Sequence, residues 1–256
     1  MSFSTTYRDC SLRERWVLFD AVATLMEPRP SVVEVYLEAG ARWGWSGGAE
    51  VLGNRFRLAM KQCFAVAEPS SEATERNRWK KTVRAVFREL SDADASAVFQ
   101  ELWSHFAATT SWSVFSDVDP CWKTLANHGY RIAIASNFDS RLLEIANALT
   151  PLDRADRIFI STELGWSKPD GRFYESILRE LNSARVWMVG DDRQNDVIAA
   201  QDAGIDAIWL RRDSASDLPP GALSTLADLA GQIGMSPRTD GDDGETGHDR
   251  DSDSTD

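Results

Sequence analysis

Cysteine is scarce in this chain of 256 residues. It occurs three times, as Cys10, Cys63 and Cys121. An odd number of cysteines this far apart excludes a scaffold held together by disulfide bonds. Scattered thiols are typical of proteins in a reducing compartment, so the sequence predicts a cytoplasmic location.

Long apolar runs and basic residues are also in short supply. No apolar run reaches the roughly 18 residues that a transmembrane helix needs, and residues 1–14 form a polar leader without the apolar core of a signal peptide. Lys and Arg number 28 against 40 Asp and Glu, so the formal net charge is −12. Nucleic acids and anionic membranes attract basic faces, and we therefore expect neither as a general partner.

The usual residues of acyl-transfer enzymes are missing as well. The histidines, His105, His128 and His248, are scattered and form no metal-binding set. The chain has no Gly-x-Ser-x-Gly motif, which presents a serine nucleophile on a sharp turn, and no Cys–His pairing signature. The sequence therefore gives no support for a serine or cysteine hydrolase.

Apolar segments of the length of buried strands are present. They occur near residues 16–20, 131–136, 157–160, 186–190 and 205–210. Beyond about residue 112 they alternate with amphipathic segments typical of helices, near residues 119–128, 140–149, 171–182, 195–203 and 222–233. This alternation predicts βαβ units, and hence an α/β fold with a doubly wound, mostly parallel, Rossmann-like sheet.

The segment between the first strand and the later ones has a different pattern. From about residue 31 to 108 apolar residues recur at helical spacing, as in Phe56, Met60 and Phe64, without a strand pattern. The strand at 16–20 must therefore join the later sheet, which makes the helical segment an insertion. The expected division is an α/β core of residues 15–28 and 112–236, an all-helical domain of 29–111, and a disordered acidic tail of 237–256.

Polar residues follow several of the predicted strands. Asp20 and Ser136 close the strands at 16–20 and 131–136, Asp191 follows the strand at 186–190, and Lys168 lies beyond the strand at 157–160. The carboxyl ends of parallel strands meet at one edge of the sheet, where ligands bind. We therefore expect these residues to converge on a single site.

These residue types suit phosphate chemistry. A carboxylate such as Asp20 can attack phosphorus and form an acyl phosphate, which divides one hydrolysis into two easier steps. A divalent cation held by Asp20 and Asp191 would reduce the repulsion between carboxylate and phosphate, and Mg2+ suits oxygen ligands of this kind. Lys168, the Ser136 hydroxyl and the backbone N–H groups of Ala21 and Val22 could contact the phosphate oxygens.

The motifs resemble those of the haloacid dehalogenase-like hydrolase superfamily. The resemblance rests on Phe19-Asp20-Ala21-Val22-Ala23-Thr24-Leu25, Ala135-Ser136-Asn137-Phe138-Asp139 and Gly165-Trp166-Ser167-Lys168-Pro169-Asp170. It implies that Asp20 is the nucleophile and that the Val22 carbonyl and Asp191 complete the metal ligands, with Asp196 ordering metal-bound water. It further implies that Thr24, Ser136 and Lys168 hold phosphate and orient Asp20, that Asn137 also belongs to the phosphate-binding residues, and that the helical insertion is a cap.

One position departs from that pattern. The phosphatases of the superfamily carry an acid/base aspartate two residues after the nucleophile, whereas this chain has Val22. Loss of a positioned acid/base costs roughly 10²–10⁴-fold in rate. The enzyme could use substrates with good leaving groups, or a nearby carboxylate could substitute, the candidates by sequence being Glu27, Asp139, Glu163 and Asp192.

Three functions remain open at this point. The first is a Mg2+-dependent phosphatase of a small phosphorylated metabolite. The second is a catalytically silent protein that binds a phosphate ligand. The third is a hydrolase of a non-phosphate leaving group, similar to the 2-haloacid dehalogenases, which also lack the second aspartate but need no metal. The substrate and the oligomeric state cannot be derived from the sequence.

Overall fold

The computed structural model describes residues 14–64, 68–182, 185–213 and 217–234. The predicted leader, apart from Glu14, and the predicted tail at 237–256 lie outside these residues. The strands are β1 (Arg15–Phe19), β2 (Met26–Pro28), β3 (Trp112–Val114), β4 (Tyr130–Ser136), β5 (Arg157–Ile160), β6 (Arg185–Gly190) and β7 (Asp206–Trp209). The helices are α1 (Val32–Arg42), α2 (Ala49–Cys63), α3 (Glu72–Val86), α4 (Asp92–His105), α5 (Val118–Asn127), α6 (Arg141–Ala148), α7 (Ser161–Leu164), α8 (Gly171–Leu181), α9 (Ala199–Asp202) and α10 (Leu229–Gln232).

The predicted α/β fold is confirmed. Within the described residues the main sheet has the order β5-β4-β1-β6-β7, and every pairing in it is parallel. The order reverses between β1 and β6, because β4 and β5 lie on one side of β1 while β6 and β7 lie on the other. Ligands of open parallel sheets bind at such a switch point, beyond the carboxyl ends of the strands.

β1 is apolar along its length because both faces of the sheet are covered. Val17 and Phe19 pack into one cluster with residues of α5, α6 and α10. Trp16 and Leu18 point to the opposite face and pack with residues of α8 and α9. Successive side chains of a strand alternate between faces, so a strand buried on both sides reads as a continuous apolar run.

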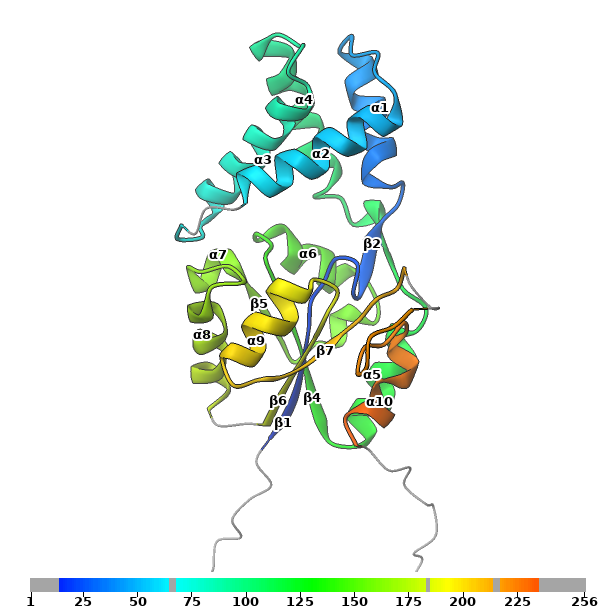
Figure 1. Cartoon of the computed structure of the whole chain (residues 1–256), viewed down its shortest axis with the longest axis vertical. Coiled ribbons are helices and arrows are strands. Elements are labelled where there is room, and N and C mark those ends of the chain that lie inside the picture. Colours follow the sequence, from blue (N-terminus) through cyan, green and yellow to red (C-terminus); the bar gives the residue numbers. More distant parts are fainter. Residues whose placement is uncertain (1–13, 65–67, 183–184, 214–216, 235–256) are drawn as a thin grey trace, which may run out of the picture.

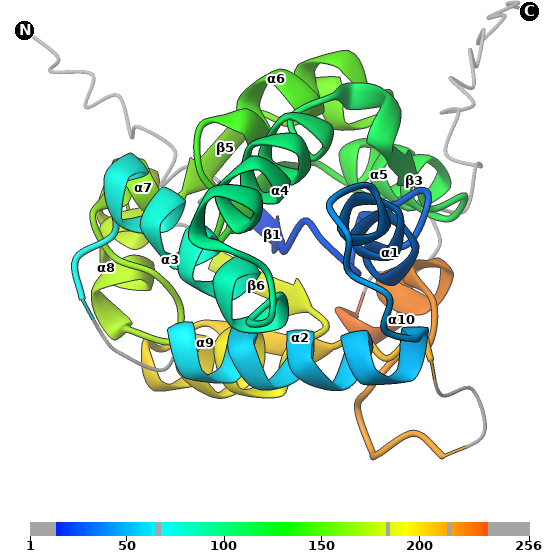
Figure 2. The ribbon, with the colours of Figure 1, turned by 90° about the horizontal axis from the view of Figure 1, so that it is seen from above.

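Helices α1 to α4 form a separate layer, here called the helical block. It lies above the carboxyl ends of the strands (Figure 1), and β1 and β6 lie beneath its middle when the molecule is seen from above (Figure 2). Three of its helices begin after a serine whose side chain accepts a hydrogen bond from the first turn, namely Ser31, Ser71 and Ser91. The block has its own apolar core, in which Tyr36 and Phe87 are fully buried.

Short strands β2 and β3 connect this block to the sheet. They pair antiparallel, with Glu27 opposite Ser113. The pair was not predicted, because three residues are too few to show an alternating pattern. The chain thus leaves the sheet after β1 and returns to it beside its point of departure.

Two predicted helices differ from the observed structure. The segment 222–233 is extended at Leu223, whose N–H donates to the carbonyl of Trp209, and only the short turns at 226–228 and α10 are helical. The helix predicted at 195–203 begins earlier, at Arg193, with a π-helical turn to Ile198 before α9. The carboxylate of Asp192 caps this turn by accepting from the backbone of residues 194 and 195, and π turns of this kind often occur at functional sites.

Candidate active site

Asp20 lies at the switch point of the sheet, directly after β1. Its N–H donates to the carbonyl of Val189 at 2.9 Å, which continues the pairing between β1 and β6 by one residue. The residue is 9% exposed and lines a cavity of about 420 Å³ below the helical block. The register explains why the predicted residues meet, since Phe19 stands opposite Ile134 of β4 and Val189 of β6.

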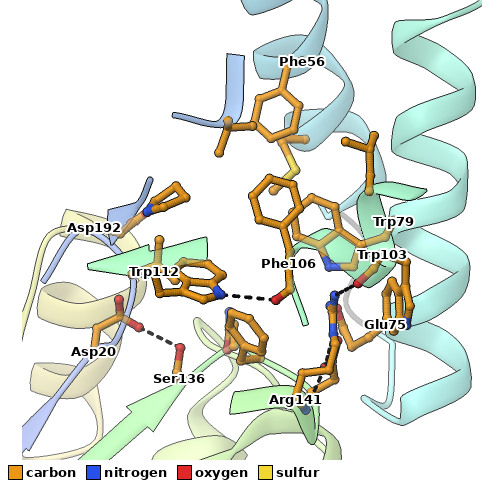
Figure 3. Close-up of a pocket in the computed structure, with 18 of the residues that line it drawn as sticks. Asp20, Phe56, Glu75, Trp79, Trp103, Phe106, Trp112, Ser136, Arg141 and Asp192 are labelled. Atoms are coloured by element: carbon orange, nitrogen blue, oxygen red, sulfur yellow. Dashed lines mark hydrogen bonds and ion pairs between the residues drawn. The ribbon is translucent and has the colours of Figure 1, made fainter. Parts of the chain in front are cut away.

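The Asp20 carboxylate is held through one of its oxygens. Oδ1 accepts from Lys168 Nζ at 2.7 Å and from the Ser136 hydroxyl at 3.2 Å, and Figure 3 shows Ser136 pointing toward Asp20. No hydrogen bond in the described part of the chain engages Oδ2. One oxygen is therefore fixed, while the other is left for chemistry.

Lys168 connects the two buried carboxylates of the site. Its Nζ donates to Asp20 Oδ1, to Asp196 Oδ1 at 2.6 Å and to the carbonyl of Ala135 at 2.9 Å. Burial alone would lower the pKa of Lys168, but Asp196 and Asp20 outweigh it and raise the pKa above its ordinary value. Three acceptors use all three protons of the ammonium group, so Lys168 orients Asp20 and has no free donor for a phosphate in this arrangement.

Asn137 fixes the position of Lys168. Its amide donates to the Lys168 carbonyl and its side-chain oxygen accepts from the Lys168 N–H, both at 2.7 Å. Asn137 also lines the cavity. The structure thus shows that Asn137, which the sequence predicts to bind phosphate, also positions Lys168.

The acidic residues form a compact cluster. Asp20, Asp191 and Asp196 each offer a carboxylate oxygen, and these oxygens lie within 4.8 Å of one another. Burial first, and then the charges of Asp20 and Asp196, raise the pKa of Asp191 to about 7, and burial likewise raises the pKa of Asp196. Ionising all three carboxylates together is costly because they repel one another. A small divalent cation bound by their oxygens would offset this repulsion.

Gly190 is required by the position of Asp196. A Cβ at residue 190 would lie 2.3 Å from the Asp196 carboxyl carbon, which is far inside contact distance. Asp196 is 1% exposed, and its second oxygen accepts from the Asp192 N–H at 3.0 Å. Only glycine leaves room for this carboxylate against the end of β6.

The loop after Asp20 presents unused backbone donors. The N–H groups of Ala23, Leu25 and Met26 are engaged within the loop, whereas no hydrogen bond among the described residues uses those of Ala21 and Val22. Ala23 has a φ of 63°, an uncommon conformation for a residue other than glycine. Adjacent free N–H groups of this kind suit an anion.

Thr24 lies apart from the position that the resemblance implies. It is fully buried, its hydroxyl has no hydrogen-bond partner within the described structure, and it does not line the cavity. Its carbonyl instead accepts from Arg212 Nε and Nη2, at 3.1 and 2.7 Å. Arg212 is also paired with Asp117, so a partly buried ion pair supports the loop. The role of Thr24 in orienting Asp20 stays a prediction.

The structure distinguishes between the four carboxylates that could replace the missing acid/base. Asp139 and Asp192 line the cavity, whereas Glu27 and Glu163 do not. Asp139 is bound at both oxygens by Arg141, at 2.7 and 2.6 Å, and Asp192 caps the turn that follows it. Asp139 therefore has both oxygens engaged, whereas no hydrogen bond among the described residues uses Oδ2 of Asp192. Val22 itself lines the cavity.

Sequence reasoning missed most of the far wall of the cavity. This wall comes from the helical block and includes Tyr36, Glu75 and Trp103, while Arg141 comes from the start of α6. Figure 3 shows Glu75, Trp103 and Arg141 at the side of the cavity away from Asp20. Their periodic positions on helices indicate burial, but no local signal distinguishes a residue that faces a cavity from one that faces a core.

The structure thus brings Asp20, Lys168 and the carboxylates that follow β6 together at the switch point of the sheet. The family model of the haloacid dehalogenase-like hydrolases matches residues 14–204, and the chain belongs to this family.

Individual relatives have different activities in their names. The haloacid dehalogenase-like hydrolase domain-containing protein 3 of Bos taurus is 28% identical over 202 residues, which cover 76% of this chain and 80% of that protein. The magnesium-bound HAD-hydrolase YfnB from Bacillus subtilis superposes with a TM-score of 0.63 at 16% identity, covering 87% of this chain and 100% of that chain. The 2-haloacid dehalogenase from Pseudomonas syringae pv. Tomato DC3000 gives 0.54 at 22% identity, covering 86% and 98%. At these identities the two structures show the fold alone.

No helix in the described parts of the chain is long and apolar enough to cross a membrane.

Proposed function

We propose that this hydrolase is a Mg2+-dependent phosphatase of a small phosphorylated molecule, with Asp20 as the nucleophile. The observation that carries the proposal is the state of the Asp20 carboxylate. Lys168 and Ser136 hold Oδ1, whereas Oδ2 has no hydrogen-bond partner among the described residues, and Asp20 lines the cavity. A nucleophile that is already held in its reactive orientation loses no conformational entropy when the reaction begins.

The chemistry proceeds in two displacements. The Asp20 oxygen attacks phosphorus, a bond from oxygen to phosphorus forms, and the bond to the leaving oxygen breaks. Water then attacks the phosphorus of the acyl phosphate, which releases inorganic phosphate and a proton and restores the carboxylate. The free N–H groups of Ala21 and Val22 are the donors best placed to bind the phosphate oxygens.

The metal ligands would be Asp20, Asp191 and Asp196 together with the Val22 carbonyl, which accepts no hydrogen bond within the described residues. Bound Mg2+ would supply positive charge that reduces repulsion between the phosphate and Asp20. The separation of the three carboxylates supports this assignment. The same cluster favours phosphate over a halide leaving group, whose release needs no cation.

Residues 29–111 would act as a cap over the site. Contacts between the helical block and the α/β core support this role: the Ser70 N–H donates to the Gly165 carbonyl at 2.8 Å, and Glu72 Oε1 accepts from the Ser140 N–H at 2.9 Å and the Thr162 hydroxyl at 2.7 Å. A cap that closes over substrate excludes water and shapes specificity.

Because Val22 can neither donate nor accept a proton, substrates with good leaving groups are expected. We expect wild-type protein to hydrolyse p-nitrophenyl phosphate when Mg2+ is present and to lose the activity with EDTA. Asp20→Asn should abolish turnover, because the amide is a far weaker nucleophile. Metal-independent turnover, or turnover that survives in the Asp20→Asn variant, would contradict the assignment.

The outcome of that assay also separates the two other functions. A folded protein that binds phosphate in the presence of Mg2+ without turnover would be a binding protein. Release of halide from 2-chloropropionate without Mg2+ would instead indicate dehalogenase chemistry on Asp20.

A further inference from the structure

The cavity continues well beyond Asp20, and one side of it is an unbroken series of aromatic rings. Phe56, Tyr36, Phe106, Trp112 and Phe138 all line it. Each ring contacts the next, with centroid separations of 5.1, 6.4, 6.1 and 5.9 Å in that order. We call these five residues the aromatic wall. It extends from the helical block to the residue that follows Asn137, beside the reacting groups.

The end of the cavity away from Asp20 is polar. Glu75 lies there, from α3, and is 3% exposed. Its Oε1 accepts from Arg78 at 2.6 Å and from the Ser70 hydroxyl at 3.4 Å. No hydrogen bond in the described structure uses Oε2, so this oxygen can accept from a ligand in the cavity.

Tyr36 contributes a second unpaired group. The residue is 2% exposed and lines the same cavity, and its hydroxyl has no hydrogen bond among the residues described. A hydroxyl can both donate to and accept from a ligand. The Tyr36 hydroxyl and Glu75 Oε2 are thus two polar groups without a partner among the described residues, in a cavity whose helical-block side is largely aromatic.

The positive charges near this end are already matched. Arg141 binds both oxygens of Asp139, and its guanidinium carbon lies 3.5 Å from the ring centroid of Trp103. Arg78 is paired with Glu75 and with Glu68. A second anionic group on a ligand would meet no free cation among these residues, whereas a donor would find the Glu75 carboxylate.

We propose that the cavity selects phosphate monoesters whose leaving group is a flat aromatic ring carrying a hydrogen-bond donor, which Glu75 and Tyr36 bind. The phosphate lies at Asp20, the ring lies along the aromatic wall, and the N–H or ammonium group reaches Oε2 of Glu75. This inference rests on the proposed function for the placement of the phosphate. A ring phosphate also meets the demand for a good leaving group that Val22 imposes.

Binding to the full-length Asp20→Asn variant tests this selection without turnover. Isothermal titration calorimetry in the presence of Mg2+ would compare 3-(aminomethyl)phenyl phosphate, phenyl phosphate, 3-carboxyphenyl phosphate and butyl phosphate. We expect the aminomethyl compound to bind about tenfold more tightly than phenyl phosphate, because a hydrogen bond to a buried charged group is among the stronger ones. The carboxy and butyl compounds should bind more weakly than phenyl phosphate.

Glu75→Gln should remove the preference for the aminomethyl compound and leave phenyl phosphate binding unchanged. Glu68→Gln is the matched control, since Glu68 is the other ion-pair partner of Arg78 and does not line the cavity. Tyr36→Phe keeps the ring and removes only the hydroxyl, so it reports on the same end of the cavity if Glu75→Gln does not fold. Tyr36→Phe should lower the affinity for the aminomethyl compound severalfold, whereas Tyr130→Phe, in β4, should not change it.

Equal binding of all four phosphates to the folded protein would overturn the inference, as would an aminomethyl preference that persists in both Glu75→Gln and Tyr36→Phe. These outcomes differ from failure of the proposed function. Turnover of aryl phosphates without discrimination would leave the function standing and remove the inference. Selective binding of the aminomethyl compound without turnover by the wild-type protein would contradict the proposed function and leave the inference about the cavity standing.

Discussion

Val22 occupies the position at which a protonatable side chain would have the largest effect on the reaction. It lines the cavity beside Asp20 and packs against the core only in part. Val22→Asp should raise kcat for substrates with poor leaving groups by about 10²-fold, because a positioned acid/base typically supplies that much. The measurement is kcat for an alkyl phosphate and an aryl phosphate in parallel.

Val22→Asn is the control for that substitution, since it has the same shape and cannot exchange a proton at neutral pH. The gain should be confined to the aspartate variant and be larger for the alkyl phosphate. Equal rates in folded Asp and Asn variants would mean that residue 22 does not face the leaving group.

Asp117 supports the loop after Asp20 through a partly buried ion pair with Arg212. It accepts from Arg212 Nη1 and Nη2, both at 2.9 Å, from the Thr225 hydroxyl at 2.7 Å and from the Leu226 N–H at 2.9 Å. Burial opposes ionisation, but these hydrogen bonds outweigh it and hold the pKa of Asp117 below its ordinary value.

The lowered pKa predicts how stability depends on pH. A carboxyl with a lower pKa in the folded state stabilises the protein above its unfolded pKa of about 3.9, and this contribution is lost as the pH falls through the folded value. Asp117→Asn should therefore reduce the free energy of unfolding by about 2 kcal/mol at pH 7, and the difference should shrink near pH 3. Urea unfolding at the two pH values measures it.

Asp92→Asn serves as the comparison, because Asp92 also pairs with an arginine, Arg84, but its side chain is 91% exposed. Its effect should stay within about 0.5 kcal/mol at either pH. A difference for Asp117→Asn that does not change with pH would show that the lost contacts, and not the charge, account for the destabilisation.

At the scale of elements, α3 carries the contact that holds the helical block over the sheet. The carboxylate of Glu72, in the first turn of α3, accepts from the Ser140 N–H and the Thr162 hydroxyl of the α/β core. Glu72→Ala should loosen this closure, raise KM several-fold and increase quenching of cavity tryptophans such as Trp79 by acrylamide. The combined readout is tryptophan fluorescence with steady-state kinetics.

Glu50→Ala offers a matched comparison, since Glu50 is also in the first turn of its helix but is exposed. It should change neither quenching nor KM. If Glu72→Ala also left both unchanged, the backbone contact of Ser70 with Gly165 would be sufficient to hold the block in place.

Elements differ in how well the sequence predicts them. The strands β1, β4, β5 and β6 were predicted within a residue at each end, because both faces of a doubly wound sheet are covered and each strand is a distinct apolar run. The segment after Gly221 was predicted as a helix from its apolar periodicity. In the folded chain Leu223 pairs with the backbone beside Trp209 instead, and a contact between segments overrides local propensity.

At the scale of the whole molecule, folding brings the carboxylates of Asp20, Asp191 and Asp196 close together. Mg2+ should therefore bind the folded state in preference to the unfolded state and raise the melting temperature. At a concentration of 100 Kd the expected stabilisation is about 2.7 kcal/mol. Differential scanning calorimetry over a series of Mg2+ concentrations measures it.

Asp191→Asn should reduce this stabilisation, because it removes one ligand of the cluster. K+ at equal ionic strength controls for screening. A melting temperature that rises equally with K+ would mean that the cluster responds to ionic strength and holds no specific cation.

The sequence by itself determined the parallel sheet and the set of residues at its carboxyl edge. Asp20, Ser136, Lys168 and Asp191 could be placed together because strand ends of one parallel sheet meet at the same edge. The resemblance added roles for these residues but not their contacts.

Only the tertiary structure decided how these residues and the cavity are arranged. The three acceptors of Lys168 come from Asp20, Ala135 and Asp196, which are far apart in the chain. Glu75 and Tyr36 lie on separate helices, and each has the periodic position of an ordinary buried residue. Which buried residues face a cavity depends on how the helices pack against the sheet, and that packing is a property of the whole fold and not of any segment of it.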